Sequence, residues 1–315
     1  MRYKKYARAG VEVSELAVGT WAIGAENYGE YDRKEAFLAI REMLDRGVNL
    51  IDTAPCYGNG TAEKFVGALL EEIPREKVLI STKVGLAPDI HTRGYRRDGS
   101  YKNVMREIES SLMNLGTDYI DFYFVHWPDE QTPISETMAA LAELKRKGYI
   151  RYVGVSNFSK EQIEEAEKIL PIDVQQPPYS MVDRRFEELM KWGIGCGISS
   201  MTYGSMGGGI LSGKMRTIPN YDAGDIRMTF YDTFREPKFS KIMELLKVMD
   251  GIAEKHQATL SEVALNWSTQ QEFVTTALVG VRSRKHVEEN CASFEWMLEA
   301  EELCAISSKI IKLGL

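Results

Sequence analysis

Four side chains that can move protons each stand at the end of a short apolar run. Asp52 closes one such run, and Tyr57 follows it five residues later, after a turn that contains a proline. Lys83 closes a second run and His126 a third. A carboxylate, a phenol, an amine and an imidazole brought together suit general acid–base chemistry at a carbonyl group. The first hypothesis is therefore a proton-transfer site built from these four residues.

Each member of this set has its own expected role. Tyr57 is the candidate proton donor, and a neighbouring Lys83 ammonium is expected to lower its pKa from the usual value of about 10. Asp52 would pair with Lys83, and His126 would hydrogen-bond the carbonyl oxygen or relay a proton. Taken singly, each residue also suits an ordinary role in a turn, a helix cap or packing. Cys56, directly before Tyr57, is expected to be a small packing residue.

Short β-like runs alternate with helical patterns along the chain. After a hairpin-like stretch at 3–13, strands are expected at residues 15–19, 48–52, 78–83, 119–126, 152–155, 172–176, 197–203 and 276–280. Apolar residues at helical spacing predict helices at 34–46, 103–115, 135–147, 160–168, 187–192, 260–270 and 285–291. Gly47, Gly116 and Gly148 each follow one of these helices, which is typical of a helix C-cap.

This alternation predicts an α/β fold, a (β/α)8 TIM barrel with an N-terminal β-hairpin, as a single domain over residues 1–315. In such a barrel, residues at strand ends share the C-terminal face, where the active site lies. A doubly wound sheet is the competing fold, but it normally carries a Gly-x-Gly-x-x-Gly turn after its first strand. The corresponding segment here, residues 19–24, lacks that pattern.

Two connections are longer than the rest, at residues 88–101 and 215–238. Both follow expected strands, on the face where a barrel opens its site. Long loops in compact domains are often lids or binding loops. The second is interpreted as a lid because it follows a glycine-rich segment, whereas the first suits a lid and a surface insertion equally.

Polar and glycine-rich segments at later strand ends indicate a site for an anionic cofactor. Ser156 and Asn157 follow one strand, and Gln176 follows the next. Residues 203–214 contain three consecutive glycines, which let backbone N–H groups approach an anion, and end in Lys214. Basic residues around Arg282 precede a helix, whose N-terminus suits a phosphate. Residues 145–147 are equally basic yet suit an ordinary helix surface, so charge alone does not decide.

Composition and charge exclude several classes of function. With 44% hydrophobic residues, 27% charged residues and a net charge of -7, the chain is typical of a globular protein whose main partner is not nucleic acid. It has no run of roughly 18 apolar residues, as a membrane helix requires, and no secretory signal. Four cysteines without paired spacing indicate a reduced, cytoplasmic protein, and four histidines without ligand spacing predict no metal. The oligomeric state cannot be read from the sequence.

The chain resembles an aldo-keto reductase over nearly its whole length, most closely the bacterial branch related to potassium-channel β subunits. The matching segments are residues 18–21, 49–58, 81–83, 126–129, 148–157, 211–214 and 288–290. The resemblance implies an NADP(H)-dependent oxidoreductase that reversibly reduces a small aldehyde or ketone, with NADPH preferred over NADH. It places Asp52, Tyr57, Lys83 and His126 on the family's catalytic tetrad. The β subunits carry asparagine in place of this histidine, which favours an enzyme here.

The resemblance also implies where the cofactor lies across the mouth of the barrel. Ser156, Asn157 and Gln176 would hold the nicotinamide carboxamide, and Tyr203 would stack on its ring. The residues implied for the pyrophosphate are Gly204, Ser205, Met206, Gly207, Gly208 and Lys214. Those implied for the adenosine end are Gly280, Arg282, His286, Glu289 and Asn290, with Arg282 first for the 2′-phosphate. Thr20, Trp21 and Asp52 complete the cofactor site, and the implied substrate site contains Trp21, Tyr57, His126 and Trp127.

The sequence departs from the family pattern at two places. Residues 204–206 read Gly-Ser-Met where Ser-Pro-Leu or Ser-Ala-Leu is commoner, and His286 stands where many relatives have Arg or Gln. The aromatic residues that suit an apolar substrate pocket as well as ordinary packing are Trp21, Tyr28, Trp127, Phe230, Tyr231 and Phe234. Two other functions remain open: a redox-sensing or regulatory protein that binds NADP(H) with little turnover, and a barrel lyase or epimerase.

Overall fold

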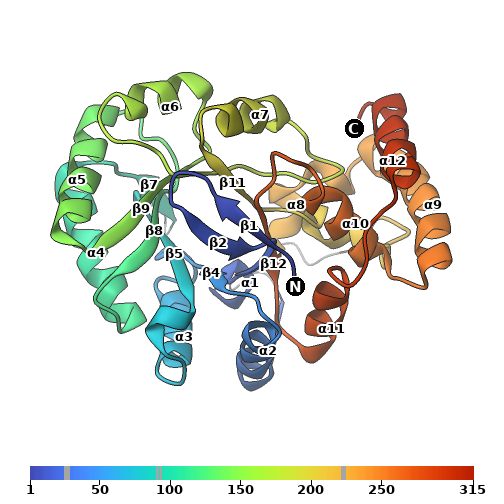
Figure 1. Cartoon of the computed structure of the whole chain (residues 1–315), viewed down its shortest axis with the longest axis horizontal. Coiled ribbons are helices and arrows are strands. Elements are labelled where there is room, and N and C mark those ends of the chain that lie inside the picture. The colour runs from blue at the N-terminus through green and yellow to red at the C-terminus, as the bar shows by residue number, and fades with distance from the viewer. Residues whose placement is uncertain (25–28, 90–91, 93, 221–224) are drawn as a thin grey trace.

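Eight parallel strands form a closed barrel in the computed structural model, which describes all residues except 25–28, 90–91, 93 and 221–224. The barrel strands are β3 (Leu16–Gly19), β4 (Leu50–Asp52), β5 (Leu79–Val84), β8 (Ile120–Val125), β9 (Ile150–Ser156), β10 (Val174–Gln176), β11 (Ser199–Thr202) and β12 (Thr276–Gly280). Pairing of β12 with β3 closes the ring (Figure 1). The predicted barrel is confirmed, and each expected barrel strand overlaps an observed one.

Several barrel strands are largely apolar because both of their faces are covered. Strand β8 reads Ile-Asp-Phe-Tyr-Phe-Val, and every residue in it is buried. Such continuous apolar runs are typical of parallel strands that pack on both sides. The one acid in this strand, Asp121, is paired with Arg75 at 2.7 Å and with Arg151 at 3.1 Å. Two guanidinium groups therefore compensate the cost of burying that carboxylate.

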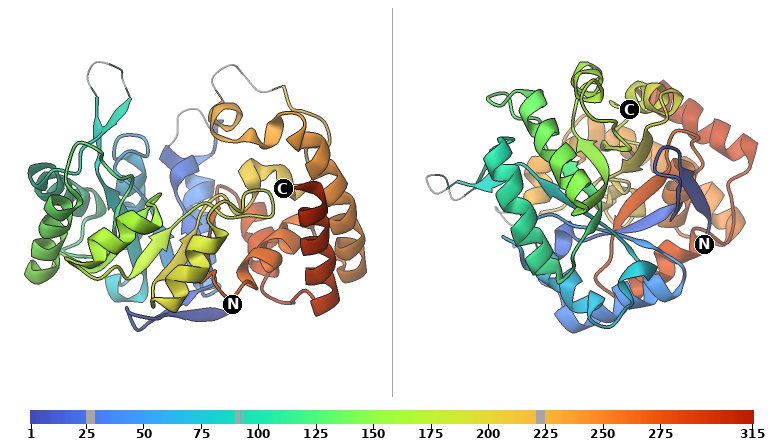
Figure 2. Two further views of the ribbon diagram at one scale, coloured as in Figure 1. Left: turned by 90° about the horizontal axis from the view of Figure 1, so that it is seen from above. Right: turned by 60° about the vertical axis from the view of Figure 1, so that its left-hand side comes forward.

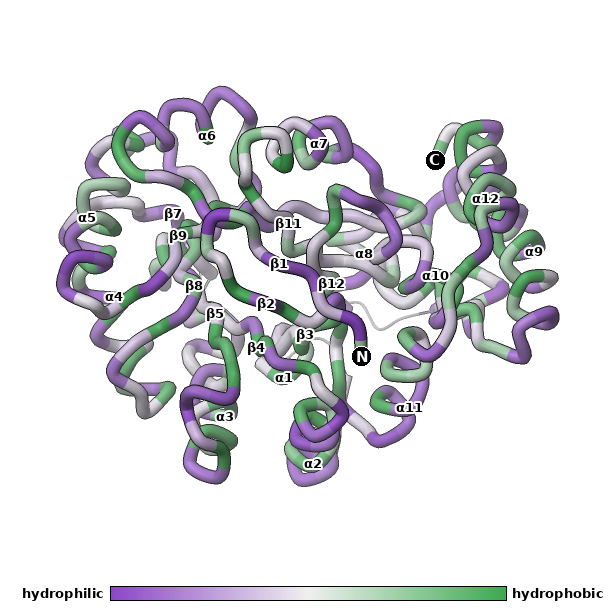
Figure 3. Tube along the Cα trace, in the orientation of Figure 1, coloured by the Kyte–Doolittle hydropathy of each residue, from purple (hydrophilic) through white to green (hydrophobic). Residues whose placement is uncertain are grey.

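Amphipathic helices surround the barrel. They are α2 (Arg33–Asp45), α3 (Thr61–Leu70), α4 (Tyr101–Leu115), α5 (Ile134–Lys147), α6 (Lys160–Glu167), α7 (Glu187–Gly195), α9 (Lys238–His256), α10 (Leu260–Thr269), α11 (Arg284–Ala292) and α12 (Ala300–Leu313). Figure 3 shows hydrophobic and hydrophilic residues alternating along the outer helices. Gly116 and Gly148 end α4 and α5 in the left-handed conformation, at φ values of 61° and 80°, as their sequence position predicts.

Helices α3, α9 and α12 were not among the helices expected from the sequence. Most of α3 is buried, including Phe65, Val66 and Leu69, and even Glu63 on this helix is buried. Its N-cap is Gly60, which has no side chain to cap the helix, so the polar residue that usually marks a helix start is missing. Helices α9 and α12 pack against each other beside the barrel, where they share a separate apolar cluster that includes Leu245 and Ile306.

The N-terminal hairpin closes one end of the barrel. Strands β1 (Tyr3–Tyr6) and β2 (Val11–Ser14) pair antiparallel, as the sequence predicts. The Tyr6 ring is fully buried and lies 5.3 Å from the Phe122 ring, centroid to centroid, in the apolar cluster that fills the barrel. Figure 2 shows this dark-blue hairpin at the opposite end from the connections that follow β5 and β11. The other end of the barrel is left for a site.

The two long connections contain regular structure. Strand β7 (Tyr95–Arg97) lies within the first and pairs antiparallel with β6 (Leu86–Pro88), which begins two residues before that connection, as a small hairpin that the sequence did not predict. The second contains the short helix α8 (Ile226–Phe230) and a 3-10 turn over Asp232–Phe234. A further short helix, α1 (Trp21–Gly24), follows β3. The β6–β7 hairpin, helix α8 and helix α1 all lie at the C-terminal ends of the barrel strands.

Candidate active site

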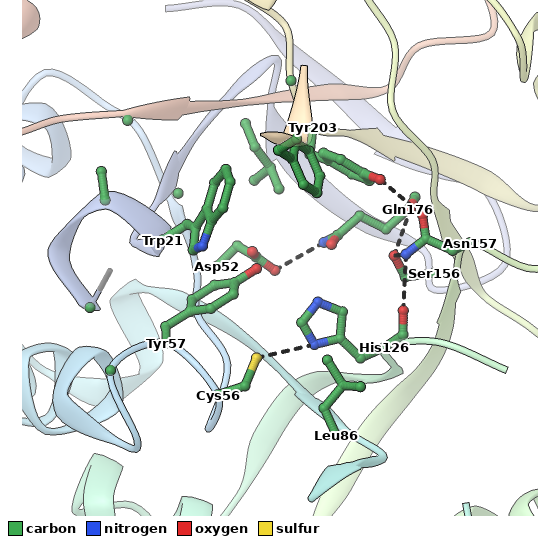
Figure 4. Close-up of a pocket in the computed structure, with 18 of the residues that line it drawn as sticks. Trp21, Asp52, Cys56, Tyr57, Leu86, His126, Ser156, Asn157, Gln176 and Tyr203 are labelled. Carbon is green, nitrogen blue, oxygen red and sulfur yellow. Dashed lines mark hydrogen bonds between the residues drawn. The ribbon is translucent and has the colours of Figure 1, made fainter. Parts of the chain in front are cut away.

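A cavity of about 750 Å³ opens at the C-terminal ends of the strands. Its lining includes Asp52, Tyr57 and His126 on one side and the glycine-rich segment from Gly204 to Gly209 on the other. This volume is within the usual range for small-molecule sites. Figure 4 shows the polar side chains converging on the middle of this space. The barrel topology therefore brings together residues that are far apart in the sequence.

Lys83 and Asp52 form a buried ion pair below the cavity. The Lys83 ammonium donates to Asp52 Oδ2 over 2.7 Å and to the Thr53 carbonyl oxygen over 2.9 Å. The other carboxylate oxygen of Asp52 accepts hydrogen bonds from the Ser81 hydroxyl at 2.6 Å and from the Gln176 amide at 2.9 Å. Both charged groups are almost fully buried, and each is fully engaged. These hydrogen bonds hold the Lys83 ammonium in one place.

The hydroxyl of Tyr57 lies on the cavity side of this pair. Lys83 Nζ donates to the Tyr57 hydroxyl oxygen at 3.2 Å. Burial, reinforced by the Asp52 carboxylate, raises the pKa of Tyr57 well above its ordinary value. The prediction that Lys83 lowers the pKa of Tyr57 is therefore wrong. Desolvation of the phenolate outweighs the attraction of the Lys83 ammonium, whose charge Asp52 already balances. A raised pKa keeps the phenol protonated, as a proton donor requires.

The imidazole of His126 faces Tyr57 across the cavity, with the two rings edge to face at 5.9 Å between centroids. Burial, together with the nearby Lys83 ammonium, lowers the pKa of His126 well below its ordinary value. The ring is therefore neutral near pH 7, with one N–H and one lone pair. Its Nδ1 atom lies 3.6 Å from the thiol sulfur of Cys56. Cys56 was expected only to pack, but it also lines the cavity.

Two glycines hold the turn that carries Tyr57. A Cβ atom on Gly24 would lie 2.3 Å from the Tyr57 carbonyl group, and one on Gly58 would lie 2.4 Å from the Gly24 carbonyl oxygen. Helix α1 therefore packs backbone to backbone against the Tyr57 turn, an approach that only glycine allows. The turn is also closed by a hydrogen bond from the Tyr57 amide to the Ala54 carbonyl at 3.1 Å.

Amide and hydroxyl groups form a continuous network on the next wall. Asn157 donates to the His126 carbonyl oxygen and to the Ser156 hydroxyl, each at 3.0 Å, and accepts from the Tyr203 hydroxyl at 2.9 Å. Asn157 adopts a φ of 62°, a left-handed conformation that asparagine tolerates better than most residues. Through Gln176 the same wall contacts Asp52. These groups can hydrogen-bond a planar carboxamide.

The glycine-rich segment and an aromatic cluster form the far wall. Gly207, Gly208 and Gly209 all have positive φ values, of 56°, 73° and 94°, so this turn needs glycine. Gly204, Ser205, Met206 and Gly208 line the cavity, whereas Gly207 does not. The Trp21 ring lies 5.2 Å from the Phe230 ring of α8, centroid to centroid. Helix α8 thus brings Phe230 to the site.

The aromatic residues proposed from the sequence divide into three groups. Those that line the cavity are Trp21, Trp127, Phe230 and Tyr231. Phe234 is buried in the cluster formed with α9, so of its two alternatives the structure supports packing. Tyr28 is outside the described residues. Sequence reasoning missed Leu86 and Tyr95, which reach the cavity from the β6–β7 hairpin. Residues 84–88 read Val-Gly-Leu-Ala-Pro, so no apolar–polar alternation marks the strand that carries Leu86.

The residues implied for the adenosine end lie beyond the cavity, except for Gly280 at its edge. Lys214 pairs with both carboxylate oxygens of Glu289, at 3.1 and 3.2 Å. The Arg282 amide donates to His286 Nδ1 at 3.3 Å, and burial and Lys214 lower the pKa of His286. The buried Asn290 amide nitrogen has no hydrogen-bond partner. Thr20 is buried below the cavity and donates to the Asp52 carbonyl oxygen at 3.0 Å.

These features fit an extended dinucleotide. The cavity runs from the Tyr57 hydroxyl to Gly280, and amide side chains line its middle. A glycine turn with positive φ values borders it. Beyond its end, the side-chain amide nitrogen of Asn290 has no hydrogen-bond partner. Within the described residues, no cluster of three His, Cys, Asp or Glu side chains is placed to hold a metal ion. Among those same residues, no helix has the length and apolar character that crossing a membrane demands. All four cysteines are free.

A sequence model of the Aldo/keto reductase family matches residues 15–311, and the chain belongs to this family. The NADH-specific methylglyoxal reductase of Escherichia coli (strain K12) is 34% identical over 298 residues, covering 90% of each protein. A probable voltage-gated potassium channel subunit beta of Arabidopsis thaliana is 30% identical over 307 residues, covering 92% of this chain and 90% of the plant protein. The glycerol dehydrogenase AKR11B4 from Gluconobacter oxydans superposes with a TM-score of 0.87 at 34% identity, covering 96% of this chain and 93% of the other. The chain is accordingly an oxidoreductase of this family that acts on small carbonyl compounds.

Proposed function

We propose that this protein is an NADP(H)-dependent carbonyl reductase in which Tyr57 is the proton donor. The observation that carries the proposal is the contact from Lys83 Nζ to the Tyr57 hydroxyl oxygen, 3.2 Å long, at the wall of the cavity. Because Lys83 donates a hydrogen bond to the phenol oxygen, the phenolic proton is available for another acceptor. A substrate carbonyl oxygen in the cavity is the acceptor that the family chemistry requires.

Two neutral donors would meet at that oxygen. Tyr57 supplies its O–H and His126 supplies a ring N–H from the opposite side of the cavity. Donors aimed at an oxygen that gains negative charge stabilise the transition state. Tyr57 then transfers its proton, and the Lys83 ammonium, held by Asp52, stabilises the phenolate that remains. In the oxidative direction the same groups return the proton.

NADPH is the cofactor we propose, and when bound it supplies the hydride. Ser156, Asn157 and Gln176 would hold its carboxamide, while Tyr203 would lie against the ring. The glycine turn and Lys214 would take the pyrophosphate, and Arg282 with His286 the 2′-phosphate. The methylglyoxal reductase of E. coli is described as NADH-specific, so the preference must be measured on this chain.

The substrate side of the cavity favours neutral, apolar carbonyl compounds. Its walls carry Trp21, Leu86, Trp127 and Phe230, and among the described residues that line it no cationic side chain occurs. Desolvating a phosphate or carboxylate against such walls is costly. We therefore propose aromatic or medium-length aliphatic aldehydes as substrates.

Binding and turnover test this proposal together. Quenching of protein fluorescence on titration with NADPH and NADH reports binding, and loss of nicotinamide absorbance with a panel of aldehydes reports reduction. Tyr57→Phe should lower kcat by about 10²–10⁴-fold because the proton donor is gone. The same variant should bind NADPH as the parent does. Full activity in Tyr57→Phe would refute the assignment, and binding without turnover would favour a redox-sensing protein.

A further inference from the structure

The contact between Cys56 and His126 has no place in the mechanism given above. Cys56 Sγ lies 3.6 Å from His126 Nδ1, the ring nitrogen turned away from the centre of the cavity (Figure 4). The other ring nitrogen faces the space beside Tyr57. Cys56 is also the residue directly before Tyr57, in a turn closed by a 2.7 Å hydrogen bond from Gly60 to Pro55. One short turn thus carries the proton donor and a group that touches the imidazole.

The other cysteines make no such contact. Cys291 lies against the sulfur of Met43, and Cys304 lies against the Ser308 hydroxyl. Cys196 is exposed at the end of α7. Contact with an imidazole is therefore particular to the turn before Tyr57, and Cys304, on an exposed helix face, offers a matched control for removal of a thiol.

Both partners of the contact are neutral near pH 7. Burial raises the pKa of the Cys56 thiol to about 12, and burial with Lys83 lowers the pKa of His126. A thiolate–imidazolium pair is thereby disfavoured. A neutral imidazole has one N–H donor and one lone pair, and its lone pair is a stronger acceptor than a thiol sulfur. The better arrangement has the thiol S–H donating to Nδ1.

We propose that Cys56 is a positioning residue that sets the tautomer of His126. Its thiol donates to Nδ1, so the single imidazole proton lies on Nε2 and faces the carbonyl oxygen of the substrate. The hydrogen bond made by one ring nitrogen decides which atom of the ring carries the proton. Without the thiol, a fraction of the molecules presents a lone pair to the substrate oxygen, where it repels. The catalytic part of this inference rests on the proposed reductase function.

Nitrogen-15 NMR of the histidine rings tests the tautomer directly. The His126 signals are assigned by their loss in His126→Gln, and long-range proton–nitrogen correlations at pH 7 then distinguish the two tautomers. The parent protein should carry its proton on Nε2. Cys56→Ala should give a mixture, and Cys56→Ser, which keeps a donor, should restore the parent spectrum. Cys304→Ala should leave the His126 signals unchanged.

Kinetics provide the second measurement. Loss of one neutral hydrogen bond predicts a kcat for Cys56→Ala that is roughly two- to tenfold lower, with the affinity for NADPH unchanged and with recovery in Cys56→Ser. An Nδ1–H tautomer or an imidazolium in the parent protein at pH 7 overturns the proposal, as does an unchanged tautomer in Cys56→Ala. The spectrum of the parent needs neither a variant nor turnover. Absence of reductase activity would therefore refute the function and leave the tautomer assignment standing.

Discussion

The ammonium of Lys83 donates to the hydroxyl oxygen of Tyr57 at 3.2 Å while its two other hydrogen bonds go to Asp52 and to the Thr53 carbonyl. All three protons of the lysine are therefore engaged. The phenol is an acceptor toward Lys83, which leaves its own proton free to be donated toward the cavity. The predictions below test this arrangement and the features that support it.

Removing Lys83 should destabilise the fold. Lys83→Met leaves the Asp52 carboxylate buried without its cation, a change that typically costs about 3–5 kcal/mol in the free energy of unfolding. Urea unfolding measures this loss. The double variant Asp52→Asn/Lys83→Met should be more stable than Lys83→Met, because no buried charge remains. Arg41→Met, which breaks an exposed pair with Glu72, should cost less than about 1 kcal/mol. Equal losses in Lys83→Met and Arg41→Met would contradict the argument.

The rate of carbonyl reduction should depend little on pH across the neutral range. Tyr57 must be protonated to act, and its raised pKa keeps it protonated even at pH values above about 10, where a free tyrosine ionises. His126 must be neutral, and its lowered pKa keeps it neutral even at pH values below about 6.5, where a free histidine becomes charged. Profiles of kcat/KM against pH, with thermal unfolding recorded at each pH to exclude denaturation, measure both limits. An acid limb centred at about 6.5 would contradict the burial of His126.

Adding a methyl group at Gly24 should displace the Tyr57 turn. The new Cβ atom would lie 2.3 Å from the backbone of Tyr57, so one backbone must move. Misplacement of a reacting group by about 1 Å can cost about 10²-fold in rate, and a loss of that order in kcat is expected for Gly24→Ala. Gly251→Ala, in helix α9 with no atom within 4 Å of the new Cβ, is the control and should be fully active. Normal activity in Gly24→Ala would show that the turn does not depend on this contact.

Arg282 should distinguish the two nicotinamide cofactors. If its guanidinium binds the 2′-phosphate, Arg282→Ala loses a charge-assisted hydrogen bond and should raise the Kd for NADPH by at least about tenfold. The Kd for NADH, which lacks that phosphate, should be unchanged. Arg284→Ala, an exposed arginine two positions later that pairs with Glu288, is the control. Tighter binding of NADH than NADPH by the parent protein would contradict the proposed preference.

The sequence by itself determined the barrel and the location of the site. The runs at 78–83 and 119–126 contain the apolar stretches 78–80 and 122–125, as parallel strands covered on both faces require, and each run ends in a polar residue. Since all barrel strands point the same way, Asp52, Lys83 and His126 had to meet at one end. Helices α3, α9 and α12 escaped prediction. In α3 the reason is physical, because the N-cap is Gly60 and no capping side chain marks the start of the helix.

Only the tertiary structure decided how the site residues act on one another. Spacing placed Lys83 near Tyr57 but wrongly suggested a lowered pKa, because the pKa depends on desolvation by walls contributed from distant segments. The same holds for Cys56, whose contact with His126 joins the turn after β4 to the end of β8. Phe234 and Phe230 are four residues apart, yet one packs in the core and the other lines the cavity. A strand pattern specifies which end of the barrel a residue occupies, whereas side-chain contacts and solvent exclusion are set only when the chain closes.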